Sequence, residues 1–311
     1  MFKKWFLSII LVGFLVVSTA CGNQATNLDS SEGNVLEVTV TIGQIADVVA
    51  NVGGEHVKVN SLMGPGVDPH LYQASQGDIS KLDKADIIFY NGLHLEGKMG
   101  EIFEKMREDK PTVAVAEAVP VDKLIAVESN EKAHDPHVWF DIDLWIYAIE
   151  EVRDALSELD SANADSYKAN ATAYIEKLKD LKTYSLDRVA EIPEESRILV
   201  TAHDAFGYFG RAYDFDVVGL QGLSTDAEYG LRDVQNLVNL LVDKNIKAVF
   251  IESSISENSI EAVVEGAKQK GHTVVIGGEL FSDAMGEAGT VEGTYYGMYK
   301  HNIDTIVDSL K

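Results

Sequence analysis

Hydrophobic positions along most of the chain fall into short runs of the kind that form β-strands, rich in Val, Ile and aromatic residues. These runs come in two sets of four. The first set is 37–43, 56–64, 86–92 and 112–117, and the second is 197–203, 215–222, 247–254 and 272–278. Most are followed by Gly, Ser or Asp and then by a helical period, as over 228–245 and 259–271. Strand alternating with helix predicts two parallel α/β sheets of four strands each.

The middle of the chain has a different pattern, in which strand signals disappear. Two helical periods meet at Asp160-Ser161, and the second is charged, rich in Ala, Lys and Leu, and ended by Pro193. Because a helix is a stiff spacer of about 1.5 Å per residue, this second segment is predicted to be a rigid linker. The predicted fold class is α/β, with two lobes joined by one long helix. The predicted boundaries are 36–160 for the N-terminal lobe, 161–192 for the linker helix and 193–311 for the C-terminal lobe.

The first 35 residues have the pattern of a targeting segment. Lys3 and Lys4 precede an apolar run that is shorter than the ~20 residues of a membrane-spanning helix, and small residues follow it. Residues 1–20 are therefore predicted to be a signal peptide. Cys21 is the single cysteine, which excludes an internal disulfide. It resembles the acylated cysteine of a bacterial lipobox, although Ser18 replaces the usual Leu, and ordinary cleavage is the alternative. Residues 21–35 are predicted to form a flexible tether from the lipidated cysteine.

The net charge and the absence of several motifs argue against some classes of function. The net charge of −24 argues against binding to phosphate backbones, which depends on Lys and Arg, and an acidic surface raises the local concentration of cations. No G-x-G-x-x-G turn follows a predicted strand, and no G-x-x-x-x-G-K-[ST], G-x-S-x-G or H-E-x-x-H motif occurs. The sequence therefore lacks the signatures of nucleotide-dependent enzymes and of common hydrolases.

Three of the eight histidines lie in similar polar settings. His70 and His137 each complete the tripeptide Asp-Pro-His, and His203 ends a predicted strand beside an aspartate. Asp283 follows the last predicted strand. Because ligands of doubly wound sheets bind beyond the carboxyl ends of the strands, these four residues, two from each half, are predicted to meet in a cleft between the lobes. Three imidazoles and one carboxylate suit a divalent transition ion such as Zn²⁺ or Mn²⁺.

Several neighbouring groups are candidates for supporting roles. Asp68 and Asp135 precede the two prolines, whose rings restrict the backbone, and are candidates to orient the site as hydrogen-bond acceptors. Glu252 ends a strand and is predicted to orient a loop rather than to bind metal. His134 is expected to face solvent. The remaining histidines, for which packing or surface roles are expected, are His56, His94, His272 and His301.

Longer stretches carry a more specific signal. They are MGPGVDPHLYQASQGDISKL, DPHVWFD, VTAHDAFGYFGRAYDF, VVGLQGLST, VFIESS and IGGELFSDAMGEAGTVEGTYYGMYKHNIDTI. These stretches resemble the TroA-like metal-binding lipoproteins, the substrate-binding components of manganese and zinc ABC transporters, over nearly all of the mature chain. The resemblance implies two α/β lobes joined by a long helix. It also implies that His70, His137, His203 and Asp283 are the metal ligands.

The same resemblance implies how the protein works. It is expected to be a monomeric, lipid-anchored protein on the extracytoplasmic face of the membrane, without enzymatic activity and without a nucleic-acid partner. It is expected to deliver its ion to a membrane permease that acts with a cytoplasmic ATPase. A metal-dependent hydrolase or a surface adhesin is a more distant alternative.

The sequence leaves two candidates for the bound metal, manganese and zinc. Many manganese-binding members carry Glu at the position of His203, whereas zinc-specific members carry His. Zinc-specific members also usually have a long loop rich in His and Asp before the second histidine, and the corresponding segment 123–137 is short here. The sequence AHDAFGYF around His203 is similar to that of TroA and of bacillary-type manganese binders, which combine three histidines with one aspartate and can hold either ion. Manganese is the predicted cargo, and zinc is the alternative.

Overall fold

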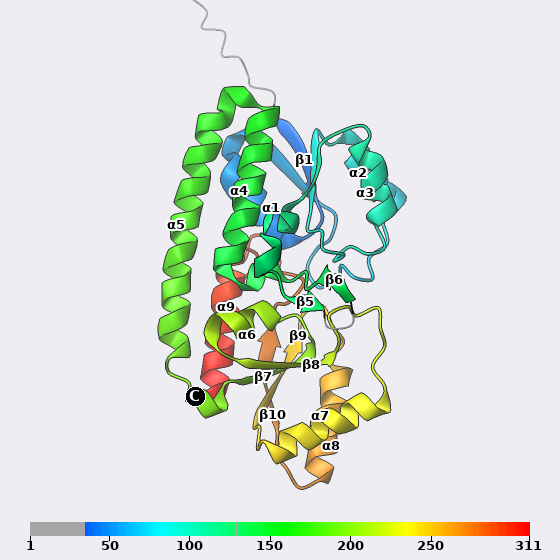
Figure 1. Cartoon of the computed structure of the whole chain (residues 1–311), viewed down its shortest axis with the longest axis vertical. Helices are drawn as coiled ribbons and strands as arrows, with labels where there is room; N and C mark the ends of the chain where they lie inside the picture. Colours follow the sequence, from blue (N-terminus) through cyan, green and yellow to red (C-terminus); the bar gives the residue numbers. More distant parts are fainter. Residues whose placement is uncertain (1–34, 128–129) are drawn as a thin grey trace, which may run out of the picture. The chain divides into compact units, whose positions relative to one another are not determined.

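The computed structural model describes residues 35–127 and 130–311. The predicted signal peptide and Cys21 lie outside these residues, as does the tether except for its last residue. In the part of the chain that is described, no helix is both long and apolar enough to cross a membrane. The predicted α/β fold with two lobes is confirmed, and Figure 1 shows the N-terminal lobe above the C-terminal one.

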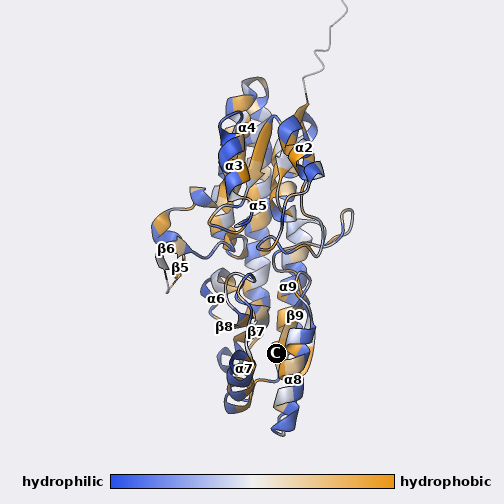
Figure 2. Cartoon of the chain, turned by 90° about the vertical axis from the view of Figure 1, so that its right-hand side faces the viewer, coloured by the Kyte–Doolittle hydropathy of each residue, from blue (hydrophilic) through white to orange (hydrophobic). Residues whose placement is uncertain are grey.

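The N-terminal lobe is built on a parallel sheet with the strand order β2-β1-β3-β4. The strands are β1 (Leu36–Val40), β2 (Val57–Ser61), β3 (Ile87–Tyr90) and β4 (Thr112–Ala114). The helices around them are α1 (Gly43–Gly53), α2 (Gln76–Lys84), α3 (Gly100–Arg107) and α4 (Ile142–Leu159). The chain moves one way from β1 to β2 and the other way from β2 to β4. Right-handed crossovers therefore put α1 on one face of the sheet and α2 and α3 on the other. Figure 2 shows the apolar strands enclosed between these helices, whose outer surfaces carry polar residues.

The C-terminal lobe contains the four predicted strands, but backbone hydrogen bonds join them in two parallel pairs rather than in the predicted single sheet of four strands. These are β7 (Ile198–His203) with β8 (Asp216–Gln221), and β9 (Ala248–Glu252) with β10 (Val275–Leu280). Where β7 lies beside β9, the backbone N–H of His203 donates to the Glu252 side chain rather than to a strand carbonyl. Helices α7 (Leu231–Asp243) and α8 (Asn258–Gln269) cover one face, and α6 (Gly207–Tyr213) and α9 (Tyr295–Leu310) cover the other.

A short antiparallel hairpin was not predicted. It consists of β5 (Ala126–Val127) and β6 (Asn130–His134), and it lies within the short segment 123–137, for which the sequence predicted no strand. The strands are too short to give a clear alternation of polar and apolar residues, which explains why the pattern missed them. The hairpin brings His134 to a half-buried position rather than the expected solvent-facing one.

The long helix α5 (Ala164–Val189) has 26 residues and contacts both lobes. The hydroxyl of Tyr174 donates to Asp47 in α1 at 2.6 Å, and that of Tyr184 donates to Asp304 in α9 at 2.6 Å. Leu178, between them, is fully buried in an apolar cluster that runs from the N-terminal sheet through α4 and α5 to α9. One hydrophobic core therefore passes along the helix from lobe to lobe. A second, smaller cluster lies under α7 and α8.

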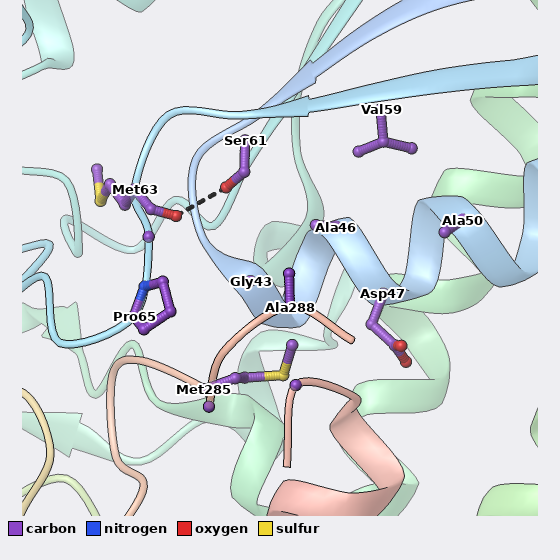
Figure 3. A pocket seen from close by; sticks show the side chains of 13 residues that line it. Gly43, Ala46, Asp47, Ala50, Val59, Ser61, Met63, Pro65, Met285 and Ala288 are labelled. Carbon is purple, nitrogen blue, oxygen red and sulfur yellow. Dashed lines mark hydrogen bonds between the residues drawn. The ribbon is translucent and has the colours of Figure 1, made fainter. Parts of the chain in front are cut away.

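A cavity of about 360 Å³ lies beside α1, where the loop after β10 approaches it (Figure 3). Met285 from that loop packs toward Gly43, and the carboxylate of Asp47 is at one end. Burial raises the pKa of Asp47 above the usual aspartate value. None of the four predicted metal ligands lines this cavity.

The shared core predicts that α5 contributes to the stability of both lobes. We expect Leu178→Ala to lower the free energy of unfolding by about 2–5 kcal/mol, because it leaves a cavity in packed surroundings. Leu186 lies on the same helix with 47% of its surface exposed, so Leu186→Ala is the matched control and should cost about 0.5 kcal/mol or less. Urea unfolding monitored by circular dichroism measures both values. Equal losses from the two variants would contradict the shared core.

Candidate metal centre

The structure brings together the four residues that the sequence predicted. His70, His137, His203 and Asp283 are all buried, and each offers one ligand atom within 4.8 Å of the others. His70 comes from the loop after β2, and His137 from the turn before α4. His203 is the last residue of β7, and Asp283 follows β10. Each lobe therefore contributes two groups.

The spacing of these atoms fits a single metal ion. The Nε2 atoms of His70 and His137 are 3.4 Å apart. The carboxylate oxygens of Asp283 are 3.5 Å from Nε2 of His70 and 3.4 Å from Nε2 of both His137 and His203. Donors arranged tetrahedrally at about 2.1 Å from one zinc-sized ion lie about 3.4 Å apart. Nε2 of His203 and both Asp283 oxygens have no hydrogen-bond partner among the described residues, so these buried atoms are free to bind a cation.

The two Asp-Pro-His tripeptides form the same local structure. In each, the aspartate Oδ1 accepts the backbone N–H of the histidine two residues later, at 2.8 Å for Asp68 and 2.9 Å for Asp135. This is an Asx turn, and the proline between the two residues fixes the backbone that makes it. The turn explains why the tripeptide occurs twice, since it sets the direction in which a histidine leaves its loop.

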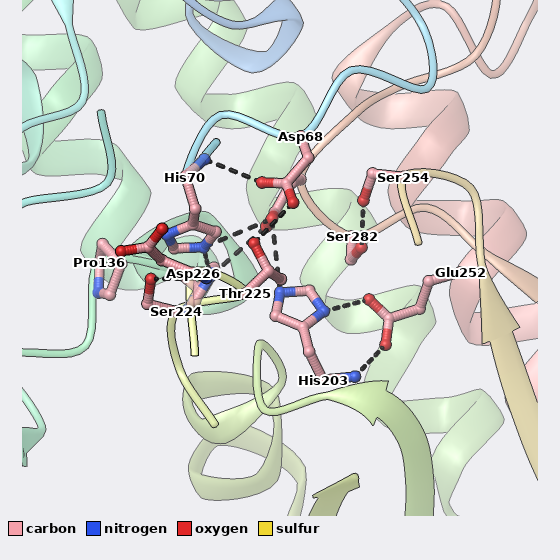
Figure 4. A network of polar contacts seen from close by, with 12 residues as sticks. Asp68, His70, Pro136, His203, Ser224, Thr225, Asp226, Glu252, Ser254 and Ser282 are labelled. Carbon is pink, nitrogen blue, oxygen red and sulfur yellow. Dashed lines mark hydrogen bonds and ion pairs between the residues drawn. The ribbon is translucent and has the colours of Figure 1, made fainter. Parts of the chain in front are cut away.

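Carboxylates also orient two of the imidazole rings. Asp135 accepts from Nδ1 of His137 at 2.7 Å, and Glu252 accepts from Nδ1 of His203 at 2.5 Å. Glu252 also accepts the backbone N–H of His203 at 2.8 Å (Figure 4). When Nδ1 carries the donated proton, Nε2 is left as the atom that faces the other lobe and can bind a metal.

The backbone beside Asp283 is fixed by residues from the N-terminal lobe. The carbonyl oxygen of Ser282 accepts from the side chain of Gln44 in α1 and from the indole of Trp139, both at 3.2 Å. On the other side, the amide side chain of Asn302 in α9 bonds both the N–H and the carbonyl of Phe281. These contacts hold the carboxylate at the junction of the lobes.

The ionisation of the site reflects its burial and its carboxylates. Burial disfavours a charged imidazole at all three histidines, and it lowers the pKa of His70 to about 4. At His137 the carboxylates of Asp135 and Asp283 outweigh burial and raise the pKa to about 9. Glu252 and Asp283 likewise raise the pKa of His203 well above its usual value. Burial opposes ionisation of Asp283, but these two charged imidazoles hold its pKa well below the usual range. The carboxylates therefore favour the protonated rings of His137 and His203, whereas burial favours the neutral ring of His70.

A cavity of about 780 Å³ opens beside the cluster. Of the four clustered residues, only His70 lines it, together with the hairpin residue His134 and the exposed His94. Neither His94 nor His134 joins the cluster of ligand atoms. The remaining predicted packing histidines lie elsewhere: His56 packs edge-on against Tyr167, and the rings of His272 and His301 contact backbone carbonyls.

Comparison with known proteins identifies the family. The family model described as zinc-uptake complex component A, periplasmic (ZnuA), matches residues 38–309. The chain belongs to this family. The resemblance to metal-transport binding proteins that the sequence predicted is thereby confirmed.

Individual relatives of this ZnuA-family chain agree with that assignment. It is 59% identical over 293 residues to the manganese-binding lipoprotein MntA of Bacillus subtilis, covering 94% of this chain and 95% of the relative. It is 50% identical over 281 residues to the zinc-binding protein TroA of Treponema pallidum, covering 90% of each. The solved structure of that periplasmic TroA superposes with a TM-score of 0.86, over 88% of this chain and 98% of TroA. A Mn-bound mutant of a periplasmic metal-binding protein from Candidatus Liberibacter asiaticus, 27% identical, superposes with a TM-score of 0.78, over 88% of this chain and 99% of that one.

Some groups around the site of this family member were not found from the sequence. Gln44, Trp139 and Thr225 each make a buried or partly buried hydrogen bond across the cleft or beside it. Trp139 and Thr225 lie in stretches that resemble the family, but nothing local in the sequence marks any of the three, and each partner is more than 100 positions away. Only the three-dimensional fold reveals these contacts.

Gly219 in β8 allows the strand to pass close to the His203 backbone. A Cβ atom at this position would lie 2.4 Å from the backbone nitrogen of Asp204 and 2.6 Å from the carbonyl carbon of His203. We expect Gly219→Ala to lower the free energy of unfolding by about 1–3 kcal/mol, because the backbone must shift to admit the methyl group. A Cβ at Gly222 would meet nothing within 4 Å, so Gly222→Ala is the control and should change stability by about 0.5 kcal/mol or less. Chemical denaturation tests this, and a harmless Gly219→Ala would argue against the close approach.

Proposed function

We propose that this protein binds one divalent transition-metal ion outside the cytoplasm and delivers it to an ABC-type import permease. His70, His137, His203 and Asp283 are the ligands in this proposal. Asp135 and Glu252 orient two of the imidazoles, and Asp68 orients the loop that carries the third. The observation that carries the proposal is the set of four buried donors within 4.8 Å of one another, three of whose atoms have no hydrogen-bond partner among the described residues.

Binding rather than catalysis is the better account of this site. A catalytic zinc keeps an open position for water and a general base nearby. Here four protein groups surround one point, and they are 0–4% exposed. The relatives are named as binding proteins, which supports the same conclusion.

We infer that manganese is the cargo and keep zinc as the alternative. Both oxygens of Asp283 face imidazole nitrogens, Oδ1 toward His137 and Oδ2 toward His70 and His203. A carboxylate that binds through both oxygens gives five donors, which suits an ion that prefers more than four ligands, as Mn²⁺ does. The 59% identity to the manganese-binding lipoprotein MntA supports the inference, whereas the zinc-binding protein TroA is 50% identical.

The proposed location is the extracytoplasmic face of the cell membrane. In this proposal residues 1–20 are removed, Cys21 is acylated, and the following tether holds the folded lobes near the permease. The lipoprotein names of several relatives support the anchor. We further propose that the protein acts as a monomer with the permease and its cytoplasmic ATPase, without a nucleic-acid partner, and that α5 is the link between lobes of about 36–160 and 193–311.

Metal analysis tests the function and the choice of ion. We expect the mature chain, purified from cells grown with trace Mn and Zn, to carry about one equivalent of Mn. In competition titrations Zn²⁺ should also bind tightly, because the intrinsic affinity order rises from Mn to Zn. One equivalent of Zn in the purified protein, with no Mn, would favour the alternative cargo. A chain that neither contains nor takes up either metal would refute the proposed function.

Removing a ligand should weaken binding without unfolding the protein. We expect His203→Ala to raise the dissociation constant for Mn²⁺ about 100-fold or more, since it removes one donor and leaves Glu252 without its ring partner. His94→Ala is the matched control, because this exposed histidine lines the neighbouring cavity but not the ligand cluster. Isothermal titration measures both. An unchanged constant for His203→Ala would remove His203 from the ligand set.

A further inference from the structure

The three imidazoles of the cluster are not held in the same way. His137 and His203 each have a carboxylate that accepts from both the backbone N–H and the ring Nδ1 of the same residue. For His70, the carboxylate of Asp68 accepts only the backbone N–H, at 2.8 Å. The second oxygen of Asp68 accepts instead from the hydroxyl of Thr225, at 2.6 Å (Figure 4). The position of His70 therefore depends on a residue of the opposite lobe.

Thr225 lies in a loop of nine residues, 222–230, that connects β8 to α7. Its side chain is turned inward, so that the residue is 7% exposed although its neighbours Ser224 and Asp226 are more accessible. Among the described residues, the loop also forms an ion pair with the N-terminal lobe, between Nζ of Lys98 and the carboxylate of Asp226 at 2.8 Å. This ion pair is 39% and 56% exposed on its two side chains. Solvent screens such a pair, so the Thr225 bond is the stronger of the two contacts.

The same loop forms part of the wall of the 780 Å³ cavity beside the ligand cluster. Gly222, Ser224 and Ala227 line that cavity, as does His70. His70 is thus the only clustered ligand that the cavity reaches, and it is also the one that the loop holds. An ion that enters through this cavity meets His70 first, and withdrawal of His70 would open the cluster toward the cavity.

We propose that Thr225 is a positioning residue that latches the 222–230 loop to Asp68, holds His70 in the ligand cluster and so sets the rate at which the bound ion leaves. This inference rests on the proposed function and adds a mechanism of release to it. When the hydrogen bond from the Thr225 hydroxyl to Asp68 breaks, the Asp68 carboxylate loses its contact with the opposite lobe. The loop that carries His70 can then move. His137 and His203 keep their own carboxylates and stay in place.

The release rate of the ion tests the latch. The full mature chain is loaded with Mn²⁺ and mixed with excess chelator in a stopped-flow instrument. We expect Thr225→Val, which keeps the shape but removes the hydroxyl, to release Mn²⁺ at least about 10-fold faster than the wild type. Thr225→Ser keeps the hydroxyl and should stay within about twofold of the wild type. Should Thr225→Val fail to fold, Thr225→Ala provides the same test without added bulk.

Two further variants separate the latch from a general loss of structure. Thr183→Val makes the same change on the exposed face of α5, where the hydroxyl bonds only within its own helix, and should leave the release rate unchanged. The double variant Asp68→Ala/Thr225→Val should release the ion no faster than Asp68→Ala alone, because Thr225 acts through Asp68.

The outcomes distinguish this inference from the proposed function. A wild-type chain that binds one ion, together with a Thr225→Val variant that releases it at the wild-type rate, would overturn the latch and leave the function standing. Additive effects in the double variant would also overturn it. A wild-type chain that takes up neither Mn²⁺ nor Zn²⁺ would overturn both.

Discussion

The carboxylate of Asp283 is 1% exposed, and neither of its oxygens has a hydrogen-bond donor among the residues that the structure describes. A buried carboxylate without donors is costly unless positive charge lies beside it. Nε2 of His137 and of His203 each lie 3.4 Å from a carboxylate oxygen of Asp283, and the carboxylates raise the pKa of both imidazoles, which favours their protonated forms. A divalent cation bound at this point would supply positive charge in the same place. The rest of the fold holds these groups in position.

Contacts on the side of the junction away from the loop hold the lobes firmly together. The hydroxyls of Tyr295 and Tyr299, both in α9, donate to the carbonyls of Trp139 and Phe140, and all four residues are buried. Breaking a buried hydrogen bond leaves polar groups without partners, which costs about 1–3 kcal/mol for each one. The apolar core along α5 adds to this resistance. A large rotation of one lobe against the other would disrupt all of these contacts, so motion at the junction is directed to the loop side, where fewer bonds must break.

The order of strands and helices could be predicted well from the sequence because the signals for these elements are local. Strand periods, the break at Asp160-Ser161 and the Asp-Pro-His turns each depend on residues close together in the chain. The four candidate ligands followed from one general rule about the carboxyl ends of parallel strands, together with family resemblance. The pairing of the C-terminal strands and the bond from Thr225 to Asp68, 157 positions apart, depend on tertiary packing. Glu252 was assigned an orienting role from the end of its strand, but its target, the backbone and ring of His203, became visible only when β7 and β9 were placed side by side.

A transport protein must hold its ion tightly and still release it, and the asymmetry among the three histidines suits both needs. The rings of His137 and His203 cannot turn away without breaking the bond from Nδ1 to a carboxylate, and the backbone N–H of the same residue holds that carboxylate in place. If all three were held in this way, an ion could leave only by disrupting the lobes themselves. In the proposed release mechanism, His70 is held through a backbone contact and a loop from the opposite lobe, so it can withdraw while His137 and His203 keep their geometry. An ion that loses this ligand would be more weakly bound and would face the cavity, so the step that opens the route would also lower the affinity.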